Sequence, residues 1–227
     1  MNKKKKLVII GVGETAEIAC EYFTVDSEYK VVGFAVNRRF ITRESLVGLP
    51  VVPLEDVTTI FPASEYWAFA AASSTKLNRV RSHLYAEAKN RGYRIASYIS
   101  SRAFVWRTAK IGENCFVFEG NTIQSSVKIG NNVVLWSGNH IGHNSEIMDH
   151  CFLSSHVVVS GFCQIGEYSF LGVNSTIIDN IVIGKDCFIG AGALVQKDVQ
   201  QYSVLQEPST DISKVSSLRL FKIGGGQ

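Results

Sequence analysis

The sequence predicts two structural classes in one chain: a small α/β domain with a parallel sheet over residues 1–102, then an all-β left-handed parallel β-helix over residues 103–200. In the first part, short apolar runs alternate with segments of helical period, a pattern typical of helices packed on a parallel sheet. In the second part an aliphatic residue recurs at every sixth position, which is the signature of a parallel β-helix. Residues 201–227 follow as a C-terminal tail, in which Asp211–Phe221 is a candidate short helix.

The composition is that of a globular protein. The 227 residues are 46% hydrophobic and 19% charged, with a net charge of +3, which excludes a disordered chain. The longest uncharged stretches, 129–145 and 150–166, contain Asn, Ser and His and do not fit a membrane span. The apolar run after the first lysines is too short for a signal-peptide core. We therefore expect a cytoplasmic protein without membrane insertion.

The first domain begins with the apolar run Lys6–Ile10, which ends in a Gly-rich turn. A helix follows, because Ala16, Ala19, Cys20 and Phe23 recur at helical spacing. Four more apolar runs predict strands: Tyr29–Val36, Val51–Leu54, Tyr66–Ala72 and Arg94–Ile99. A second helix, closed by Gly92, is predicted between the last two strands, with one face marked by Leu77, Val80, Leu84, Tyr85 and Ala88. The order predicts a small Rossmann-like sheet.

The turn after the first strand reads G-x-G-x-x-A, which places backbone N–H groups and a helix N-terminus where an anion can bind. A dinucleotide site also needs an acidic residue at the end of the second strand, and this chain has Asn37 followed by Arg38 there, so we expect no NAD. We expect a nucleotide or sugar phosphate instead, held by Gly11, Gly13, Asn37, Arg38, Ser73 and Lys76. The alternative is that the glycines only form a tight turn.

The positive charge of the first domain supports binding of a phosphorylated ligand. Residues 1–102 carry 15 Lys and Arg against 10 Asp and Glu, while the second half is slightly acidic. This excess is too small for a nucleic-acid surface but suits a phosphorylated small molecule.

The period of six runs without interruption from Val105 to Val195, and all sixteen positions are Ile, Leu or Val. The next position is often Gly, which we expect to supply the backbone freedom of a corner. Three hexads make one triangular coil, so about five coils are expected, with residues 18 apart stacked about 4.8 Å from each other. Cys115, Cys151 and Cys187 then lie two coils apart, too far for a disulfide, and are predicted to be reduced core thiols.

Five aromatic side chains occupy positions that should point outward: Phe116, Phe118, Trp136, Phe152 and Phe170. An apolar surface of this kind invites self-association, and threefold packing would cover it, so we expect a homotrimer.

The histidines offer the candidate chemistry. His143 follows Gly142 at an outward corner, where it is either a solvated side chain or a functional one. Gly161 lies 18 residues later and therefore one coil further along the same corner. A neutral imidazole accepts a proton near pH 7, as a general base must.

Together these motifs carry a resemblance. The motifs are the βαβ start with G-x-G-x-x-A, the unbroken hexads with Ile141-Gly142-His143-Asn144, and the later Ile189-Gly190-Ala191-Gly192-Ala193. With them the chain resembles the sialic-acid O-acetyltransferase (NeuD) family, which includes bacterial nucleotide-amino-sugar N-acetyltransferases. The resemblance implies a trimer with acetyl-CoA in the groove between subunits and a nucleotide-linked sugar presented by the N-terminal domain. It also implies that His143 is the base.

The resemblance extends to further site residues. Gly161 matches the family glycine whose backbone N–H binds the oxyanion. Acetyl-CoA is expected along Gly161, Gly172, Gly190 and Ala191, where small side chains allow close approach, and His140 is expected near the acceptor.

Three positions depart from the family pattern. Asn144 stands where an acidic residue often follows the histidine, so we expect Glu119 or Asp149 to orient the imidazole. Phe152 replaces a second family histidine, which affects the expected acetyl-CoA contacts, and Asn37 leaves the nucleotide open among UDP, dTDP and GDP.

The reading we favour is an acetyl-CoA-dependent N-acetyltransferase of a nucleotide-linked amino sugar, with no metal. An O-acetyltransferase acting on sialic acid or another sugar hydroxyl would use the same base. A zinc carbonic anhydrase is disfavoured, because the positions two coils from His143 are Arg107 and Asp179. A non-catalytic β-helix binding protein is the third class.

Overall fold

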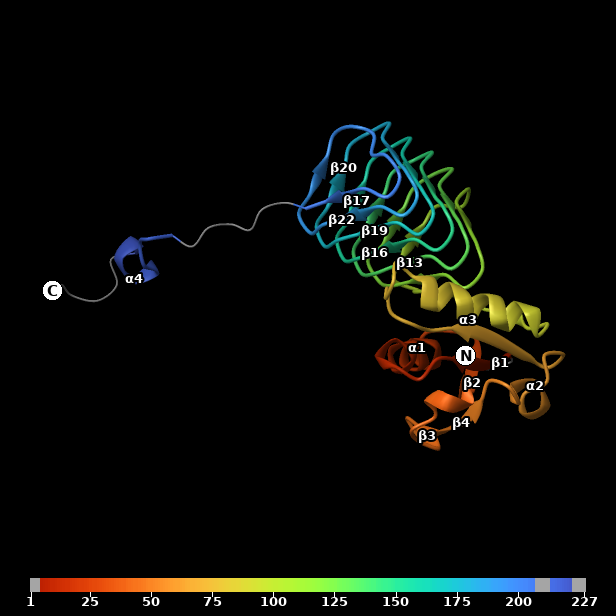
Figure 1. Ribbon diagram of the computed structural model, residues 1–227. Coiled ribbons are helices and arrows are strands. Elements are labelled where there is room, and N and C mark those ends of the chain that lie inside the picture. Colours follow the sequence, from red (N-terminus) through yellow and green to blue (C-terminus); the bar gives the residue numbers. More distant parts are fainter. Residues whose placement is uncertain (1–4, 207–212, 222–227) are drawn as a thin grey trace.

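The computed structural model describes residues 5–206 and 213–221, and it shows a small α/β domain followed by a stack of triangular coils (Figure 1). The first domain has one sheet in the order β3-β4-β2-β1-β5-β6. Its pairs are parallel except for the β3–β4 hairpin. The strands are β1 (Lys5–Ile10), β2 (Tyr29–Val36), β3 (Ser45–Leu46), β4 (Leu49–Pro53), β5 (Tyr66–Ala70) and β6 (Arg94–Ile95). The predicted parallel sheet is confirmed.

Helices cover both faces of this sheet. On one face α1 (Glu14–Val25) buries Ala16, Ala19 and Phe23 in a cluster with Ile9 and Phe69. On the other face α3 (Arg79–Asn90) buries Leu84 and Ala88 in a second cluster, together with α2 (Val57–Ile60). A short 3₁₀ turn, η1 (Arg38–Phe40), follows β2. This arrangement is the Rossmann-like fold that the alternating pattern predicts.

The second domain is a left-handed parallel β-helix whose strands of two residues form three faces. Strands on one face pair residues 18 apart, as in Thr122 with His140, so the predicted coil length is confirmed. The first face contains β7 (Tyr98–Ile99), β10 (Phe116–Val117), β13 (Val134–Leu135), β16 (Phe152–Leu153), β19 (Phe170–Leu171), β22 (Phe188–Ile189) and β24 (Val204–Leu205). The second face contains β8 (Phe104–Val105), β11 (Thr122–Ile123), β14 (His140–Ile141), β17 (Val158–Val159), β20 (Thr176–Ile177) and β23 (Leu194–Val195). The third face contains β9 (Lys110–Ile111), β12 (Lys128–Ile129), β15 (Glu146–Ile147), β18 (Gln164–Ile165) and β21 (Val182–Ile183).

The predicted single strand Arg94–Ile99 is wrong. β6 ends the sheet of the first domain, and β7 pairs with β10 as the first strand of the β-helix. Strand pairing in the β-helix therefore runs from Tyr98 to Leu205, slightly beyond 103–200 at both ends. The division of the chain at residue 102 into separate folding domains stays a prediction.

The glycine after each aliphatic residue has a different role from the one expected. These glycines do not have a positive φ; a Cβ on Gly172 would lie 2.5 Å from the backbone nitrogen of Ala191 on the next coil. Close approach of coils is therefore what excludes a side chain there. The left-handed residues lie two positions later, as at Asn132 (φ 58°) and Asn144 (φ 58°), where Asn tolerates this conformation well.

The interior of the β-helix is apolar. The repeated aliphatic residues from 117 to 195 are almost fully buried, and Cys115, Cys151, Cys163 and Cys187 pack among them. Burial raises the pKa of the Cys115 thiol to about 11 and that of Cys151 to about 12. These four cysteines are inert core thiols, as predicted.

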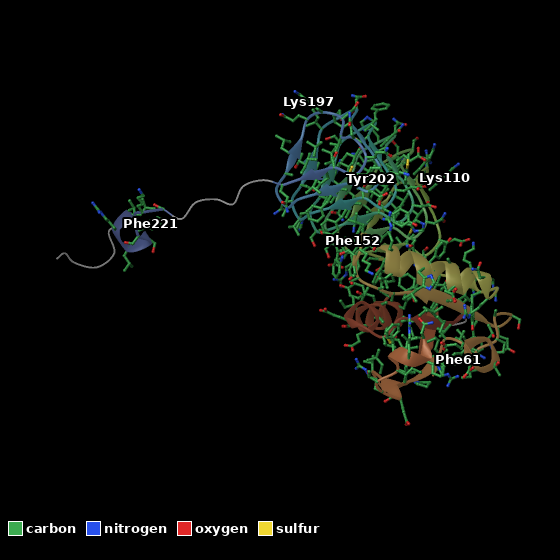
Figure 2. The ribbon with its side chains drawn as sticks, viewed as in Figure 1. Phe61, Lys110, Phe152, Lys197, Tyr202 and Phe221 are labelled. Atoms are coloured by element: carbon green, nitrogen blue, oxygen red, sulfur yellow. The ribbon has the colours of Figure 1, made fainter. Side chains whose placement is uncertain are left out.

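The expectation that the outward aromatics are exposed is wrong for the first coils. Phe116 and Phe118 are 1% exposed, because α1 and β5 cover them, and Trp136 and Phe152 pack against the same cluster. Figure 2 shows Phe152 where the β-helix meets the first domain. The first domain thus covers much of the surface from which a trimer was inferred.

A buried arginine joins the two domains. Arg81 on α3 is 0% exposed and donates to the carbonyl oxygens of Ala70 (3.2 Å), Asn132 (2.8 Å) and Asn114 (2.7 Å). Burial lowers its pKa to about 10. The predicted apolar face of this helix is partly wrong, since Val80 is 40% exposed while Arg81 is inside.

In the tail, the helix α4 (Ser217–Leu220) is shorter than the predicted Asp211–Phe221 segment, and Asp211 and Ile212 lie outside the described residues. Its N-cap is Ser216, whose Oγ accepts the backbone N–H of Arg219 at 3.3 Å.

Candidate functional site

His143 lies on the corner where the chain passes from the second face to the third, directly after β14, and its side chain is exposed. Its Nδ1 is 3.3 Å from Oε1 of Gln124. A Cβ on Gly161 would lie 2.7 Å from its Cε1, so the imidazole rests on the glycine of the next coil. The ring of Phe162 meets the imidazole edge-on, with centroids 5.0 Å apart. The predicted stacking of His143 and Gly161 is confirmed.

Glu119 and Asp149 do not orient His143 within this chain. Each is the second residue after the aliphatic of its hexad, as His143 is, but the three hexads lie on three different faces. Glu119 accepts from Ser137 Oγ at 2.6 Å and Tyr22 Oη at 3.3 Å, and the bond from Ser137 helps lower its pKa. Asp149 accepts from the N–H and Nδ2 of Asn131. The residue beside the imidazole is Gln124, which the sequence argument missed.

The backbone N–H of Gly161 is already engaged. It donates to Oδ1 of Asp179, the residue one coil further on, at 2.8 Å. Asp179 is exposed on the same corner. The oxyanion donor expected at Gly161 is therefore next to the imidazole but occupied by a carboxylate in this structure.

The residues expected to bind acetyl-CoA lie on two corners. Gly172, Gly190 and Ala191 stack where the first face turns into the second, whereas Gly161 lies where the second turns into the third. One chain does not bring the four together.

A shallow hollow adjoins His143 on the second face. It is lined by Phe104, Trp106, Thr122, Gln124 and Ser125, along with His143. Phe104 and Trp106 are 54% and 43% exposed, and their rings lie 6.0 Å apart. They precede and follow the aliphatic Val105, so the outward-facing positions of the first hexad were the signal that could have identified them. His140 begins β14, the strand beside Thr122, and is half-buried.

The Gly-rich turn of the first domain has the geometry of an anion site. Gly11 has φ 130°, and a Cβ there would collide with the carbonyl oxygen of Ala71. Gly13 caps α1 and has no atom within 4 Å of the Cβ position, so the space above the turn is open. Glu14 and Glu17 place negative charge in the first helical turn, where the helix dipole favours it.

Arg38 is partly committed elsewhere. Its Nη2 lies 2.6 Å from Oδ2 of Asp56, and its N–H donates to the carboxylate of Glu55. Backbone hydrogen bonds at Glu55 lower the pKa of that carboxyl. The acidic groups at this sheet edge thus follow β4, whereas they were expected after β2, where the chain has Asn37.

The loop after β5 is strained. Lys76 and Leu77 have φ values of 54° and 48°, left-handed conformations that such residues adopt at a cost of roughly 1–3 kcal/mol each. Asn78 follows with φ 62°, which Asn tolerates well. Ser73 and Thr75 share a hydrogen bond of 2.6 Å between their hydroxyl groups. The loop lies at the carboxyl end of β5, the edge where ligands of such sheets bind.

A pocket connects this loop with the β-helix. Thr15, Ser73 and Ser74 line it from the first domain, and Trp136 and Phe152 line it from the first face of the β-helix. His143 belongs to a corner of the other two faces. The nucleotide-binding candidates and the candidate base therefore lie on different sides of one chain.

The hexads match a known family. Residues 108–143, 126–161 and 162–197 match the model described as bacterial transferase hexapeptide (six repeats). The match lies within the β-helix and covers 90 of its residues, 108–197. No curated protein matches the chain by sequence.

Solved structures resemble both domains, the hexapeptide domain and the one before it. PerB from Caulobacter crescentus, in complex with CoA and GDP-perosamine, has a TM-score of 0.78 and 25% identity, covering 88% of this chain and 92% of that one. Two further structures of that perosamine N-acetyltransferase carry one histidine replaced by Asn or Ala. The acetyltransferase domain of PglB from Neisseria gonorrhoeae has a TM-score of 0.80 and 22% identity, covering 92% and 100% of the two chains. WeeI from Acinetobacter baumannii has a TM-score of 0.74 and 20% identity, covering 90% and 98%. The last two show the shared fold.

Within residues 5–206 and 213–221, no three His, Cys, Asp or Glu side chains gather as metal ligands do. Among the same residues, no helix has the length and apolarity needed to span a membrane.

Proposed function

We propose that this protein is an acetyl-CoA-dependent N-acetyltransferase that acetylates the amino group of a nucleotide-linked sugar. The observation that carries the proposal is an exposed histidine, His143, on a corner of a hexapeptide β-helix that is joined to a Rossmann-like domain with an open Gly-rich turn. A structure of the same two-domain fold at 25% identity is described with CoA and GDP-perosamine bound.

In the proposed reaction the sugar amine attacks the carbonyl carbon of the thioester, and the C–N bond forms as the amine loses a proton to His143. The tetrahedral intermediate then collapses, the C–S bond breaks, and the imidazolium returns its proton to the thiolate of CoA. General-base assistance of this kind contributes roughly 10²–10⁴-fold in rate. The base needs an accessible ring nitrogen, which the exposed corner provides.

The oxyanion of the intermediate needs an N–H donor close to the imidazole. Gly161 N–H is the nearest candidate along the corner, and Asp179 must leave it before the oxyanion forms. Fixed backbone donors in such sites are worth several kcal/mol.

The active site is proposed to form between copies of the chain. The pocket with Ser73 and Phe152 lies on the first face, while His143 lies between the second and third, so a second copy is needed to bring a histidine to a pocket. A homotrimer does this with three equivalent sites. Exposed apolar side chains remain on the second and third faces, including Phe104, Val182 and Leu194. The cytoplasmic location stays a prediction.

The test is acetyl-CoA turnover, followed by release of the CoA thiol, against UDP-, dTDP- and GDP-linked amino sugars. Sialic acid is included as a hydroxyl acceptor, so that O-acetylation would be detected. His143→Ala should lower kcat by roughly 10²–10⁴-fold, with His83→Ala on the exposed side of α3 as the matched control. The Kd for acetyl-CoA should change by no more than a few-fold.

Either of two results would remove the proposal. One is wild-type protein that binds no CoA in calorimetry, which would favour a binding protein. The other is His143→Ala with more than about a tenth of the wild-type rate, because general-base catalysis contributes more than that.

A further inference from the structure

One oxygen atom accepts from two nitrogens of the candidate base. Oε1 of Gln124 lies 2.9 Å from the backbone nitrogen of His143 and 3.3 Å from its Nδ1. Gln124 is half-buried at the end of β11, and its own N–H donates to the carbonyl oxygen of Ile141, so its backbone is fixed beside the corner.

The backbone contact decides the chemistry of the ring. A backbone N–H is only a donor, so the side-chain atom of Gln124 facing it is the amide oxygen and not the amide nitrogen. The same oxygen faces Nδ1 and is only an acceptor, so Nδ1 carries the hydrogen of the neutral imidazole. The lone pair of that imidazole is then on Nε2, the nitrogen that a general base needs free.

The need for Gln124 follows from the glycine one coil later. At another corner, the N–H of Glu113 donates to Asn131 Oδ1 (3.0 Å) and the N–H of Asn131 donates to Asp149 Oδ1 (2.6 Å), so each side chain holds the N–H one coil before it. The residue one coil after His143 is Gly161, which has no side chain to accept. Gln124 supplies that acceptor from the preceding coil and binds Nδ1 with the same atom.

We propose that Gln124 is the positioning residue of the base: its amide oxygen fixes the orientation and the tautomer of His143. This inference rests on the proposed function. Because an amide is neutral, the imidazolium gains less stabilisation than it would from a carboxylate. The proton is accordingly released more readily to the departing thiolate.

The charged and titratable groups of the same region are few. Arg107 and Asp179 occupy the same corner two coils before and two coils after His143, and His140 begins its strand. Asp179 is bound to Gly161 N–H. The hollow itself presents Phe104, Trp106, Thr122 and Ser125, none of which titrates near neutral pH.

The first experiment determines the tautomer of His143 in the absence of substrate. Long-range ¹H–¹⁵N correlation spectra of the imidazoles in the full chain, with His143→Asn to assign the signals, should show protonated Nδ1 and unprotonated Nε2 in the neutral ring. Gln124→Ala should abolish this preference, and Gln164→Ala, a change to an exposed glutamine on the third face, should leave it unchanged. The same tautomer in wild type and Gln124→Ala would overturn the inference.

The second experiment measures kcat, KM and the pH dependence of kcat/KM for two variants of Gln124. Gln124→Ala should lower kcat about five- to tenfold, as expected for loss of one hydrogen bond, with the KM for acetyl-CoA unchanged. Gln124→Glu should keep kcat near the wild-type value, because a carboxylate oxygen accepts the same hydrogen bonds. It should move the acidic limb of the kcat/KM profile up by about one pH unit, because a carboxylate favours the protonated ring. An acidic limb that does not move, or a loss confined to KM, would contradict a positioning role.

The two proposals fail separately. If wild-type protein acetylates none of the acceptors, the proposed function is wrong, and the tautomer spectra still decide whether Gln124 fixes the ring. If acetylation is observed and both Gln124 variants behave as wild type, only the positioning role is wrong.

Discussion

Adding a single methyl group to Gly161 should disable the base while the fold stays intact. The φ of Gly161 is not in the left-handed region, so alanine fits its backbone. The added Cβ would lie 2.7 Å from Cε1 and 2.9 Å from Nε2 of His143. Carbon atoms in contact lie at about 3.5–4.0 Å, so the ring must retreat by about 1 Å. The imidazole is the exposed end of a side chain and can be displaced, whereas backbone cannot.

The expected loss follows from that displacement. A misplacement of about 1 Å in a reacting group costs about 10²-fold in rate, so kcat/KM for Gly161→Ala should fall by about that factor. The free energy of unfolding should change by less than about 1 kcal/mol. Thiol release measures the first quantity and urea denaturation the second. Gly172→Ala is the contrasting control, because its Cβ would meet backbone at 2.5 Å and should destabilise the coil itself.

A double variant separates the base from other causes. If the methyl acts through His143, then Gly161→Ala should have almost no further effect in a His143→Ala background, since contacting residues are not additive. A second drop of about 10²-fold in that background would refute the reasoning. It would place the effect on acetyl-CoA or on the oxyanion.

Three further predictions follow from the structure. If sites form between copies, mixed trimers made by co-refolding His143→Ala with Gly13→Val, which fills the open turn, should recover about a quarter of the wild-type rate. Half of the copies then supply an intact histidine and half supply an intact Gly-rich turn, so about a quarter of the sites have both. No recovery would place the whole site in one chain. Burial lowers the pKa of His150 below its ordinary 6.5, so the stability that the neutral ring contributes is present above about pH 6.5 and is lost as the pH falls through the folded pKa. His150→Asn should therefore flatten the decline in the free energy of unfolding between about pH 7 and 5, measured in urea titrations, whereas the control His83→Gln should not. Arg81→Leu should lower the free energy of unfolding at pH 7 by at least about 2 kcal/mol, because the buried carbonyl oxygens of Asn114 and Asn132 lose their donor, whereas that of Ala70 keeps Asn114 Nδ2. A smaller loss, measured by urea denaturation, would show that water replaces the guanidinium.

The architecture of the β-helix was predictable because one residue in six is fixed by the core. Each of the sixteen hexad aliphatics from Val105 to Val195 is the second residue of a two-residue strand. The spacing of 18 then gives the neighbour of each corner residue by arithmetic alone. That is why the stacking of His143 on Gly161 was predicted correctly from sequence.

What covers an outward face was not predictable from the same pattern. Phe116 and Phe118 have the spacing of surface residues, yet α1 and β5 bury them. Arginine is a residue type that usually lies at the surface, yet the guanidinium of Arg81 is buried and donates to the carbonyl oxygens of Ala70 in β5 and of Asn114 and Asn132 in the β-helix. Both errors have one cause, because hexad and helix periodicity describe a segment alone and contain no information on how two domains dock.

The group that orients His143 was not predicted for a different reason: Gln124 is neither a carboxylate nor at a corner position equivalent to that of His143. The stack instead contains a hydrogen bond that recurs at several corners: the side chain of the second residue after the aliphatic accepts the N–H one coil before it, as with Asn131, Asp149 and Asp179. A glycine at that position has no side chain to accept this N–H, which is then satisfied from another coil. Gly161 occupies that position beside His143, so the same missing side chain gives the imidazole its space and requires Gln124 to turn toward it. In this sequence, the glycine two places after Val159 and one coil after His143 was therefore the signal that the N–H of His143 takes its acceptor from the preceding coil.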